Sequence, residues 1–194
     1  MHAEASQQST AAGARAVVPR EAEVGTASAA ALAAFAARTF PDACPEWMPA
    51  EHVQAFIAEG LSERQFAAWL ADPNSHVLVA EGPDRALVGY AVCLHGLHDE
   101  NPEQWAGQRT AYLSKLYVDP ESRGAGVARS LFDLALETAR ADGCAAFWLG
   151  VNDENARARA FYLKAGLAVS GRRRFRVGDT LCTDDVLGRE LLGA

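Results

Sequence analysis

The chain has 194 residues, of which 49% are hydrophobic and 22% are charged, and its formal net charge at pH 7 is -7. This composition is that of an ordinary globular protein, and it excludes collagenous and wholly disordered chains. The acidic balance argues against nucleic acid and anionic membranes as main partners, because both attract basic surfaces. We therefore expect one folded domain with a small-molecule or peptide partner.

Cysteine usage and the N-terminal residues indicate the location of the protein. Residues 1–14 lack the basic start and apolar run of a secretory signal, so we expect a disordered leader before a single domain over residues 15–194. No apolar stretch reaches the length of about 20 residues that a membrane-spanning helix needs. The cysteines lie far apart without a CxxC pair, which favours neither a disulfide framework nor a zinc site and fits a reducing cytoplasm. They are Cys44, Cys93, Cys144 and Cys182.

The first third of the chain is predicted to be mainly helical. Residues 15–18 are a short strand candidate, and an alanine-rich helix is expected over residues 21–40, with acidic residues in its first turn and a proline after it. Two more helices are expected, over residues 49–57 and 62–70, from apolar residues at helical spacing.

Strands are predicted in the middle of the chain. Residues 76–81 and 86–97 flank the turn signal Gly82-Pro83-Asp84 and indicate an antiparallel hairpin. Residues 110–118 form a further strand candidate. The polar stretch 98–108 between them is expected to be a mobile loop near the working surface.

The last third alternates helices and strands. A 3.6-residue apolar period after Pro120 predicts a helix that ends at Gly143, and the apolar run 145–151 predicts a buried central strand, which together imply a parallel crossover. A second amphipathic helix stops at Gly166. The final strands, 168–177 and 180–191, are joined by Gly178-Asp179, a pair that favours a hairpin turn.

A strand end, a short loop and a helix start follow one another over residues 118–128, which are rich in small residues. A helix N-terminus presents unpaired N–H groups and partial positive charge, so this stretch can bind the diphosphate of a nucleotide-type cofactor. A P-loop is excluded because no Gly-Lys-Ser/Thr is present, and a Rossmann motif is excluded because Arg129 stands at its third small position.

Two motifs carry a family resemblance. Arg123, Gly126 and Ala128 resemble the Arg/Gln-x-x-Gly-x-Gly/Ala motif of the GNAT superfamily of N-acetyltransferases, although glycines that only permit close packing would give the same pattern. Residues 155–167 resemble the family's Asn-x-x-Ala-x-x-Phe-Tyr-x-x-x-Gly-Phe signature, with Leu167 in place of the final aromatic. The amino-acid sequences of residues 116–118 and 148–151 are similar to those of the polyamine-type bacterial branch of this family.

The resemblance covers about residues 86–191. It implies an α/β GNAT fold, with a central mixed, mostly antiparallel sheet of about six or seven strands, helices on both faces, and a parallel strand-helix-strand crossover at the cofactor site. It also implies acetyl-CoA-dependent transfer of an acetyl group to a primary amine of a small molecule or protein by direct attack. No metal is expected, and a homodimer is compatible with the family.

The resemblance assigns roles to residues. It makes Tyr162 the general acid that protonates the CoA thiolate and Asn155 a pantetheine ligand, two turns apart on one helical face. An aromatic packed on the apolar face is the alternative for Tyr162. The remaining cofactor-binding residues are expected to act through backbone groups and the phosphate loop; they are Leu116, Tyr117, Val118, Arg123, Gly124, Ala125, Gly126, Val127, Ala128 and Arg129.

The general base is not identified by the sequence. Many relatives use a carboxylate on the strand that corresponds to residues 110–118, but no acidic residue occurs there. Asp99, Glu100, Glu103 or a chain of water molecules could take this role. A non-catalytic acyl-CoA-binding sensor or interaction module is therefore the alternative function, and a site for another phosphorylated ligand is a third.

Other polar groups are expected to have structural or solvated roles. His95 and His98 are expected to be surface histidines and not half of a metal site. The basic run from Arg172 to Arg176 is expected to be a solvated hairpin strand, because the protein as a whole is acidic.

Overall fold

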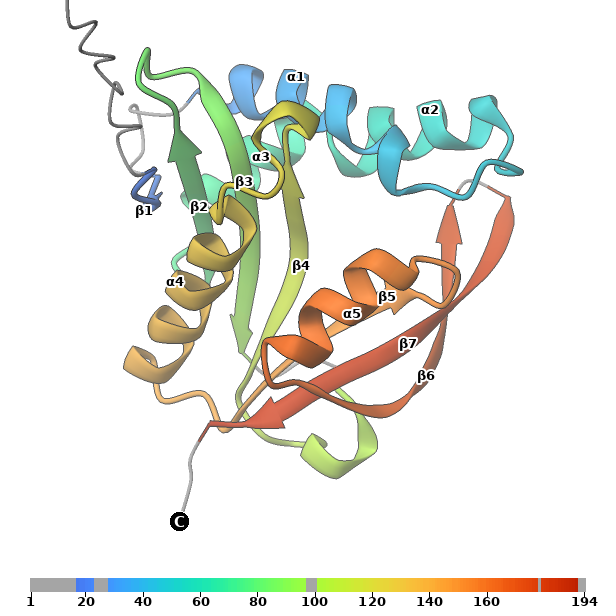
Figure 1. Ribbon diagram of the computed structural model, residues 1–194. Helices are drawn as coiled ribbons and strands as arrows, with labels where there is room; N and C mark the ends of the chain where they lie inside the picture. The colour runs from blue at the N-terminus through green and yellow to red at the C-terminus, as the bar shows by residue number, and fades with distance from the viewer. Residues whose placement is uncertain (1–16, 23–27, 97–100, 178, 192–194) are drawn as a thin grey trace, which may run out of the picture.

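The computed structural model of the chain describes residues 17–22, 28–96, 101–177 and 179–191. Within these residues the strands are β1 (Arg20–Glu21), β2 (Ser75–Glu81), β3 (Leu87–Gly96), β4 (Thr110–Val118), β5 (Ala146–Asn152), β6 (Ala168–Val177) and β7 (Thr180–Glu190). They form one sheet in the order β1-β2-β3-β4-β5-β7-β6 (Figure 1). β4 and β5 are parallel and the other neighbours are antiparallel, which confirms the predicted mixed sheet.

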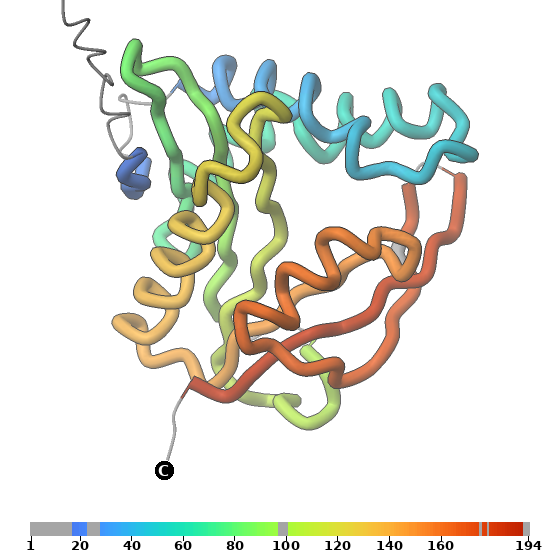
Figure 2. Tube along the Cα trace, in the orientation of Figure 1, coloured from blue at the N-terminus to red at the C-terminus, as the bar shows by residue number. Residues whose placement is uncertain are grey.

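Helices cover both faces of the sheet, as predicted. One face carries α1 (Ala29–Thr39), α2 (Ala50–Gly60) and α3 (Glu63–Ala71), and the other carries α4 (Val127–Ala141) and α5 (Ala156–Lys164). In Figure 2, α4 and α5 lie in front of the strands, and α1 and α2 run along the top of the view. The short 3-10 helices are η1 (Pro41–Ala43), η2 (Glu103–Trp105) and η3 (Pro120–Ser122).

The alternation of side chains along the central strands divides the core into two layers. On β3, Ala91 and Cys93 pack toward α4, whereas Tyr90 and Val92 pack toward α1 and α3, and all four are fully buried. Burial of one large apolar side chain contributes about 1.5–3 kcal/mol, so both layers hold the helices firmly on the sheet.

The predictions for the N-terminal part were wrong in detail. The first described strand is Arg20–Glu21, paired with Val79 and Leu78 of β2. Of the predicted strand 15–18, residues 17 and 18 are not in a strand, and residues 15 and 16 lie outside the described residues. The first helix begins at Ala29, because the Ser28 hydroxyl accepts a hydrogen bond from the Ala31 N–H at 3.0 Å and caps it there. The expected leader, residues 1–14, lies outside the described residues.

Most other elements match the predictions, but the stretch 98–108 differs. Its described part contains η2, and Trp105 is only 5% exposed, packed against Ala146, Trp148 and Val186. The Thr110 hydroxyl donates to the Asn101 side chain at 2.7 Å, which also fixes the stretch. The described residues 101–108 are therefore anchored to the sheet. His98 and Gly178 lie outside the described residues. Among the described helices, none is long and apolar enough to cross a membrane.

The two central strands diverge along their length. The parallel ladder joins Thr110, Ala111 and Tyr112 of β4 to residues 146–148 of β5 and ends there. Beyond it, β4 pairs only with β3 and β5 pairs only with β7. Figure 1 shows the gap that opens between β4 and the β5-β7-β6 part of the sheet. The backbone edge of β4 after Tyr112 therefore lacks a partner on the β5 side.

Candidate active site

A cavity of about 620 Å³ lies on the α4 and α5 side of the point where β4 and β5 diverge. Its wall is formed by the end of β4, the loop before α4, the first turn of α4 and one face of α5. Of the site residues predicted from the sequence, all but Ala125 line it: Leu116, Tyr117, Val118, Arg123, Gly124, Gly126, Val127, Ala128, Arg129, Asn155 and Tyr162.

The loop before α4 has the backbone that a phosphate cradle requires. Gly124 and Gly126 have φ of +84° and +86°, and Gly126 is the N-cap of α4. A Cβ at either glycine would meet no atom within 4 Å. The glycines therefore do not serve close packing; they permit a left-handed backbone and leave the N–H groups of the first turn open. The residues present fit the diphosphate of a CoA-type group.

Arg123 of this loop and Arg129 in the first turn of α4 are both paired with carboxylates. The Arg123 Nη2 lies 2.8 Å from the Asp42 Oδ2, which ties η1 to the loop. The Arg129 Nε lies 2.8 Å from the Asp133 Oδ2, one turn further along α4. Because both pairs are partly exposed, they hold the arginines only weakly. An anionic ligand can therefore compete for these side chains.

Asn155, the N-cap of α5, and Tyr162 within that helix both have a structural role and both line the larger cavity. The Asn155 Oδ1 accepts a hydrogen bond from the Ala158 N–H at 3.0 Å and caps the helix. Tyr162 is 8% exposed, and its ring centroid lies 6.0 Å from that of Phe132 and 5.1 Å from that of Phe161. Burial raises the pKa of its phenol, so the hydroxyl stays protonated at neutral pH. The ring thus packs in the core and also lines the cavity.

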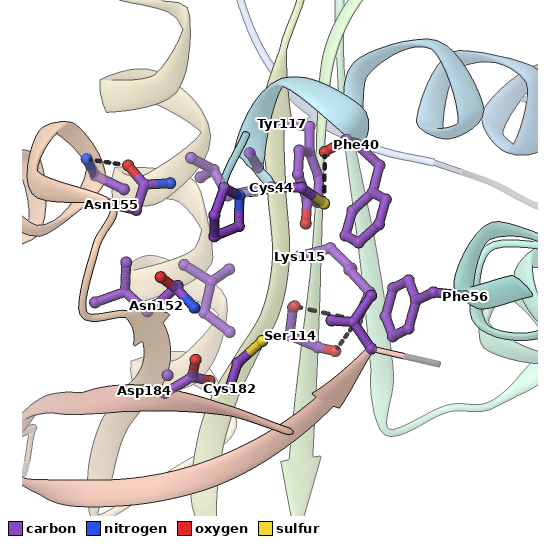
Figure 3. A pocket seen from close by; sticks show the side chains of 18 of the residues that line it. Phe40, Cys44, Phe56, Ser114, Lys115, Tyr117, Asn152, Asn155, Cys182 and Asp184 are labelled. Atoms are coloured by element: carbon purple, nitrogen blue, oxygen red, sulfur yellow. Dashed lines mark hydrogen bonds between the residues drawn. The ribbon is translucent and has the colours of Figure 1, made fainter. Parts of the chain in front are cut away.

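A second, smaller cavity of about 160 Å³ lies beside β4 and reaches α2 and the start of β7. Figure 3 shows its lining, with Phe40 and Phe56 on one side and Asn152 and Asp184 on the other. The two cavities share lining residues where the central strands diverge, namely Ala43, Leu116, Tyr117, Asn155, Ala158 and Tyr162. A ligand group in one cavity can therefore meet a group in the other beside Tyr162.

Sequence reasoning missed the charged groups of the smaller cavity. Asp184 is 4% exposed, and burial raises the pKa of its carboxyl while Arg173 opposes that shift. The Arg173 Nε lies 3.4 Å from the Asp184 Oδ2, and its Nη2 donates to the Tyr112 hydroxyl at 2.7 Å. The prediction of a solvated strand was therefore wrong for Arg173, whereas Arg172 is mostly exposed. The one feature of the sequence that could have indicated these buried charges is the acidic pair Asp184 and Asp185 within an otherwise mainly apolar strand.

Lys115 of β4 also lines the smaller cavity, and its side chain is half-buried. Burial, with a further contribution from Arg173, lowers the pKa of its ammonium group to about 8. Of the base candidates named from the sequence, Glu103 is exposed and lines neither cavity. Asp99 and Glu100 lie outside the described residues.

His95 is not a surface residue, contrary to the prediction. It is 2% exposed, and its Nδ1 lies 2.8 Å from the Asp142 Oδ2, an oxygen that also lies 2.9 Å from the His76 Nε2. The His76 Nδ1 in turn lies 2.7 Å from a Glu21 oxygen. Burial lowers the pKa of His95 to about 4. This network joins β1, β2, β3 and the end of α4 and lines neither cavity.

Comparison with known proteins agrees with this geometry. The sequence model of the Acetyltransferase (GNAT) family matches residues 36–167. An uncharacterized N-acetyltransferase of Mycobacterium tuberculosis (strain ATCC 25618 / H37Rv) is 42% identical over 161 residues, which make up 83% of this chain and 96% of that protein. Thialysine N-epsilon-acetyltransferase of Bos taurus is 33% identical over 115 residues, 58% of this chain and 62% of that protein.

A solved structure shares the fold. The PaiA N-acetyltransferase of Thermoplasma acidophilum, in complex with coenzyme A, superimposes with a TM-score of 0.70 at 17% identity and covers 90% of this chain and 99% of that one. At this identity the likeness concerns the fold alone. The family match, which spans both sequence motifs and most of the residues around the larger cavity, shows that the chain belongs to the GNAT family of acetyltransferases.

Proposed function

We propose that this acetyltransferase uses acetyl-CoA in the larger cavity and transfers the acetyl group to a primary amine in the smaller cavity. The observation that carries the proposal is the junction of the two cavities at Tyr162, Asn155 and the unpaired edge of β4. Bound acetyl-CoA supplies an activated thioester. The protein's part is to hold it, to bring the amine beside it and to move protons.

The backbone of this chain holds the cofactor in the proposal. The first-turn N–H groups of α4 and the open loop at Gly124 and Gly126 bind the diphosphate, with Arg123 adding charge. Backbone groups of Leu116, Tyr117 and Val118 bind the pantetheine arm, because they have no partner strand on the β5 side. Asn155 contributes its side-chain amide at the junction.

Tyr162 acts as the general acid. Its phenol lies at the junction of the cavities and keeps its proton at neutral pH because burial raises its pKa. It donates this proton to the sulfur that leaves. The aromatic contacts with Phe132 and Phe161 fix the direction of the ring. The packing role and the catalytic role of Tyr162 thus support one another.

Asp184 receives the proton of the amine, directly or through water. An alkylamine has a pKa near 10.4 and is mostly charged at neutral pH, so a base is needed before attack. Among the described residues that line the smaller cavity, Asp184 is the one carboxylate. Its raised pKa makes it a better proton acceptor than an ordinary aspartate.

The proposal is tested by measuring thiol release from acetyl-CoA with a broad panel of amines, for the wild type and for Tyr162→Phe. We expect turnover by the wild type and a kcat lower by about 10²-fold or more for the variant, with unchanged affinity for CoA. Leu163→Ala, at the exposed neighbour of Tyr162, is the matched control and should keep full turnover. Acetyl-CoA binding without thiol release for any amine would overturn the proposal and favour a non-catalytic acyl-CoA sensor.

A further inference from the structure

Lys115 places an ammonium group inside the smaller cavity. Its Nζ donates to the Ser114 Oγ at 2.9 Å and to the Ser114 carbonyl at 3.2 Å, as Figure 3 shows. It also lies 5.9 Å from the ring centroid of Phe56 and 5.6 Å from that of Trp69. An ammonium group has three N–H donors, and the two Ser114 oxygens use two of them. One donor is left for a ligand.

The charge of Lys115 is not balanced by the protein around it. Within the described part of the chain Lys115 makes no ion pair. The charged residues that line the smaller cavity are Lys115, Arg173 and Asp184, and Arg173 already pairs with Asp184. Burial raises the pKa values of four thiols and phenols in the lining, to about 11 for Cys44; the others are Tyr117, Tyr162 and Cys182. They are neutral at pH 7, so the cavity keeps a net positive charge.

A half-buried cation without a counter-ion is unfavourable, and here the lowered pKa of Lys115 reflects that. A bound anionic group would remove the imbalance, since a charge-assisted hydrogen bond in a desolvated site is stronger than a neutral one. A second cationic group would increase it. The cavity therefore discriminates among amines by the charge of the rest of the molecule.

We propose that the acceptor is a small amine that also carries a carboxylate, which binds the Lys115 ammonium while the amine lies beside Tyr162 and Asp184. This inference rests on the proposed function and names its substrate class. A cavity of about 160 Å³ suits a molecule of amino-acid size. Polyamines, whose remote ends are cationic, are disfavoured acceptors.

The test compares acceptors with and without this carboxylate. L-lysine, L-lysinamide and cadaverine share the same amine-bearing chain, but only L-lysine has a carboxylate. We expect a kcat/KM for L-lysine that is about 10- to 100-fold higher than for the other two, the range that one charge-assisted hydrogen bond supplies. Mass spectrometry of the products identifies the nitrogen that is acetylated.

Variants of the chain locate the source of the preference. Lys115→Met, which keeps the length of the side chain without its charge, should bring the kcat/KM for L-lysine down to that for L-lysinamide. Lys115→Arg should retain the preference. Arg64→Met removes an exposed cation on α3 outside the cavity and should leave it unchanged. Equal rates for L-lysine and L-lysinamide with the wild type, or a preference that survives in Lys115→Met, would overturn the inference.

A binding measurement separates this inference from the proposed function. Calorimetry of L-lysine binding to the CoA-loaded protein at pH 8.5, in buffers of different ionisation enthalpy, should show proton uptake that Lys115→Met abolishes. Binding without uptake, or no binding, would contradict the assignment of Lys115. Failure of the enzyme to release thiol with any amine, despite normal uptake, would instead contradict only the proposed function.

Discussion

Gly150 of β5 and the guanidinium of Arg173 occupy adjoining space, so that a Cβ at Gly150 would lie 2.5 Å from the Arg173 Nε. The absence of a side chain on β5 thus lets Arg173 lie across the strand, over the rings of Tyr112 and Trp148 at 5.1 and 5.6 Å. From there it reaches Asp184. One glycine therefore sets the electrostatic environment of the carboxylate in the smaller cavity.

The Gly150→Ala variant should fold but should have a lower kcat/KM at neutral pH. The added methyl meets the flexible end of Arg173 and not the backbone, so the guanidinium moves away and the loss in stability stays below about 1.5 kcal/mol. Without its cation, Asp184 should have a still higher pKa, which moves the acidic limb of the kcat/KM profile to higher pH. Gly171→Ala is the matched control, because a Cβ there meets nothing within 4 Å. An unchanged pH profile for Gly150→Ala would contradict this prediction.

Asp184→Asn tests the proposed base directly. The wild type should lose kcat/KM as the pH falls through the raised pKa of Asp184, because the protonated carboxyl cannot accept a proton. The variant should have a kcat/KM lower by about 10²–10⁴-fold at neutral pH, the usual contribution of a general base, and should lack that acidic limb.

Asp185→Asn is the control for this substitution. Asp185 is the neighbour of Asp184 on β7, but it pairs with Arg159 at 2.8 Å and lines neither cavity. Its replacement should lower the free energy of unfolding slightly and leave the pH profile intact. If both variants behave alike, Asp184 has only a structural role.

Valine at both Gly124 and Gly126 should abolish cofactor binding. A β-branched residue with φ near +85° is strained, and its side chain would fill the open space beside the first turn of α4. We expect at least a 100-fold loss of CoA affinity by calorimetry. Gly143→Ala, at the other end of α4 with φ +67°, carries similar strain and should lose stability without losing affinity. Retained affinity in the double variant would remove the loop from the cofactor site.

The buried His95 should make the protein sensitive to acid. In the unfolded chain a histidine titrates near pH 6.5, whereas burial lowers the pKa of His95 to about 4. Between these values the unfolded state binds more protons, so the free energy of unfolding falls as the pH falls, by a total on the order of 3 kcal/mol. Urea unfolding at pH 7.5 and pH 4.5 measures this difference. His95→Gln should be less stable at pH 7.5 and less dependent on pH, whereas His52→Gln should keep the full dependence.

The mixed sheet could be predicted from the sequence because its signals are local, and the residues predicted to bind the cofactor, which the structure gathers around the larger cavity, also come from local motifs. The period of α4, the apolar run of β5 and the small residues from Gly124 to Ala128 each lie within one segment. The start of α1 was misplaced because alanine favours helix over the whole stretch, while the Ser28 cap decides the boundary. The sequence has several serines and threonines that could cap a helix, and it does not show which one does so.

The smaller cavity could not be predicted because its residues come from distant segments. Lys115, Arg173 and Asp184 lie on β4, β6 and β7, and only the antiparallel pairing of β6 with β7 and the divergence of β4 from β5 bring them together. In the sequence Arg173 is one of several arginines. His95 was misjudged for the same reason, since its partner Asp142 is 47 residues away.

The divergence of β4 from β5 also separates two kinds of recognition along one strand. Leu116, Tyr117 and Val118 at the end of β4 line the larger cavity and have no partner strand on the β5 side, whereas Lys115 lines the smaller cavity. A backbone contact does not depend on the identity of the residue that makes it. If the cofactor is held by the main chain as proposed, the side chains of β4 can change from one relative to another and select new acceptors without weakening the hold on CoA.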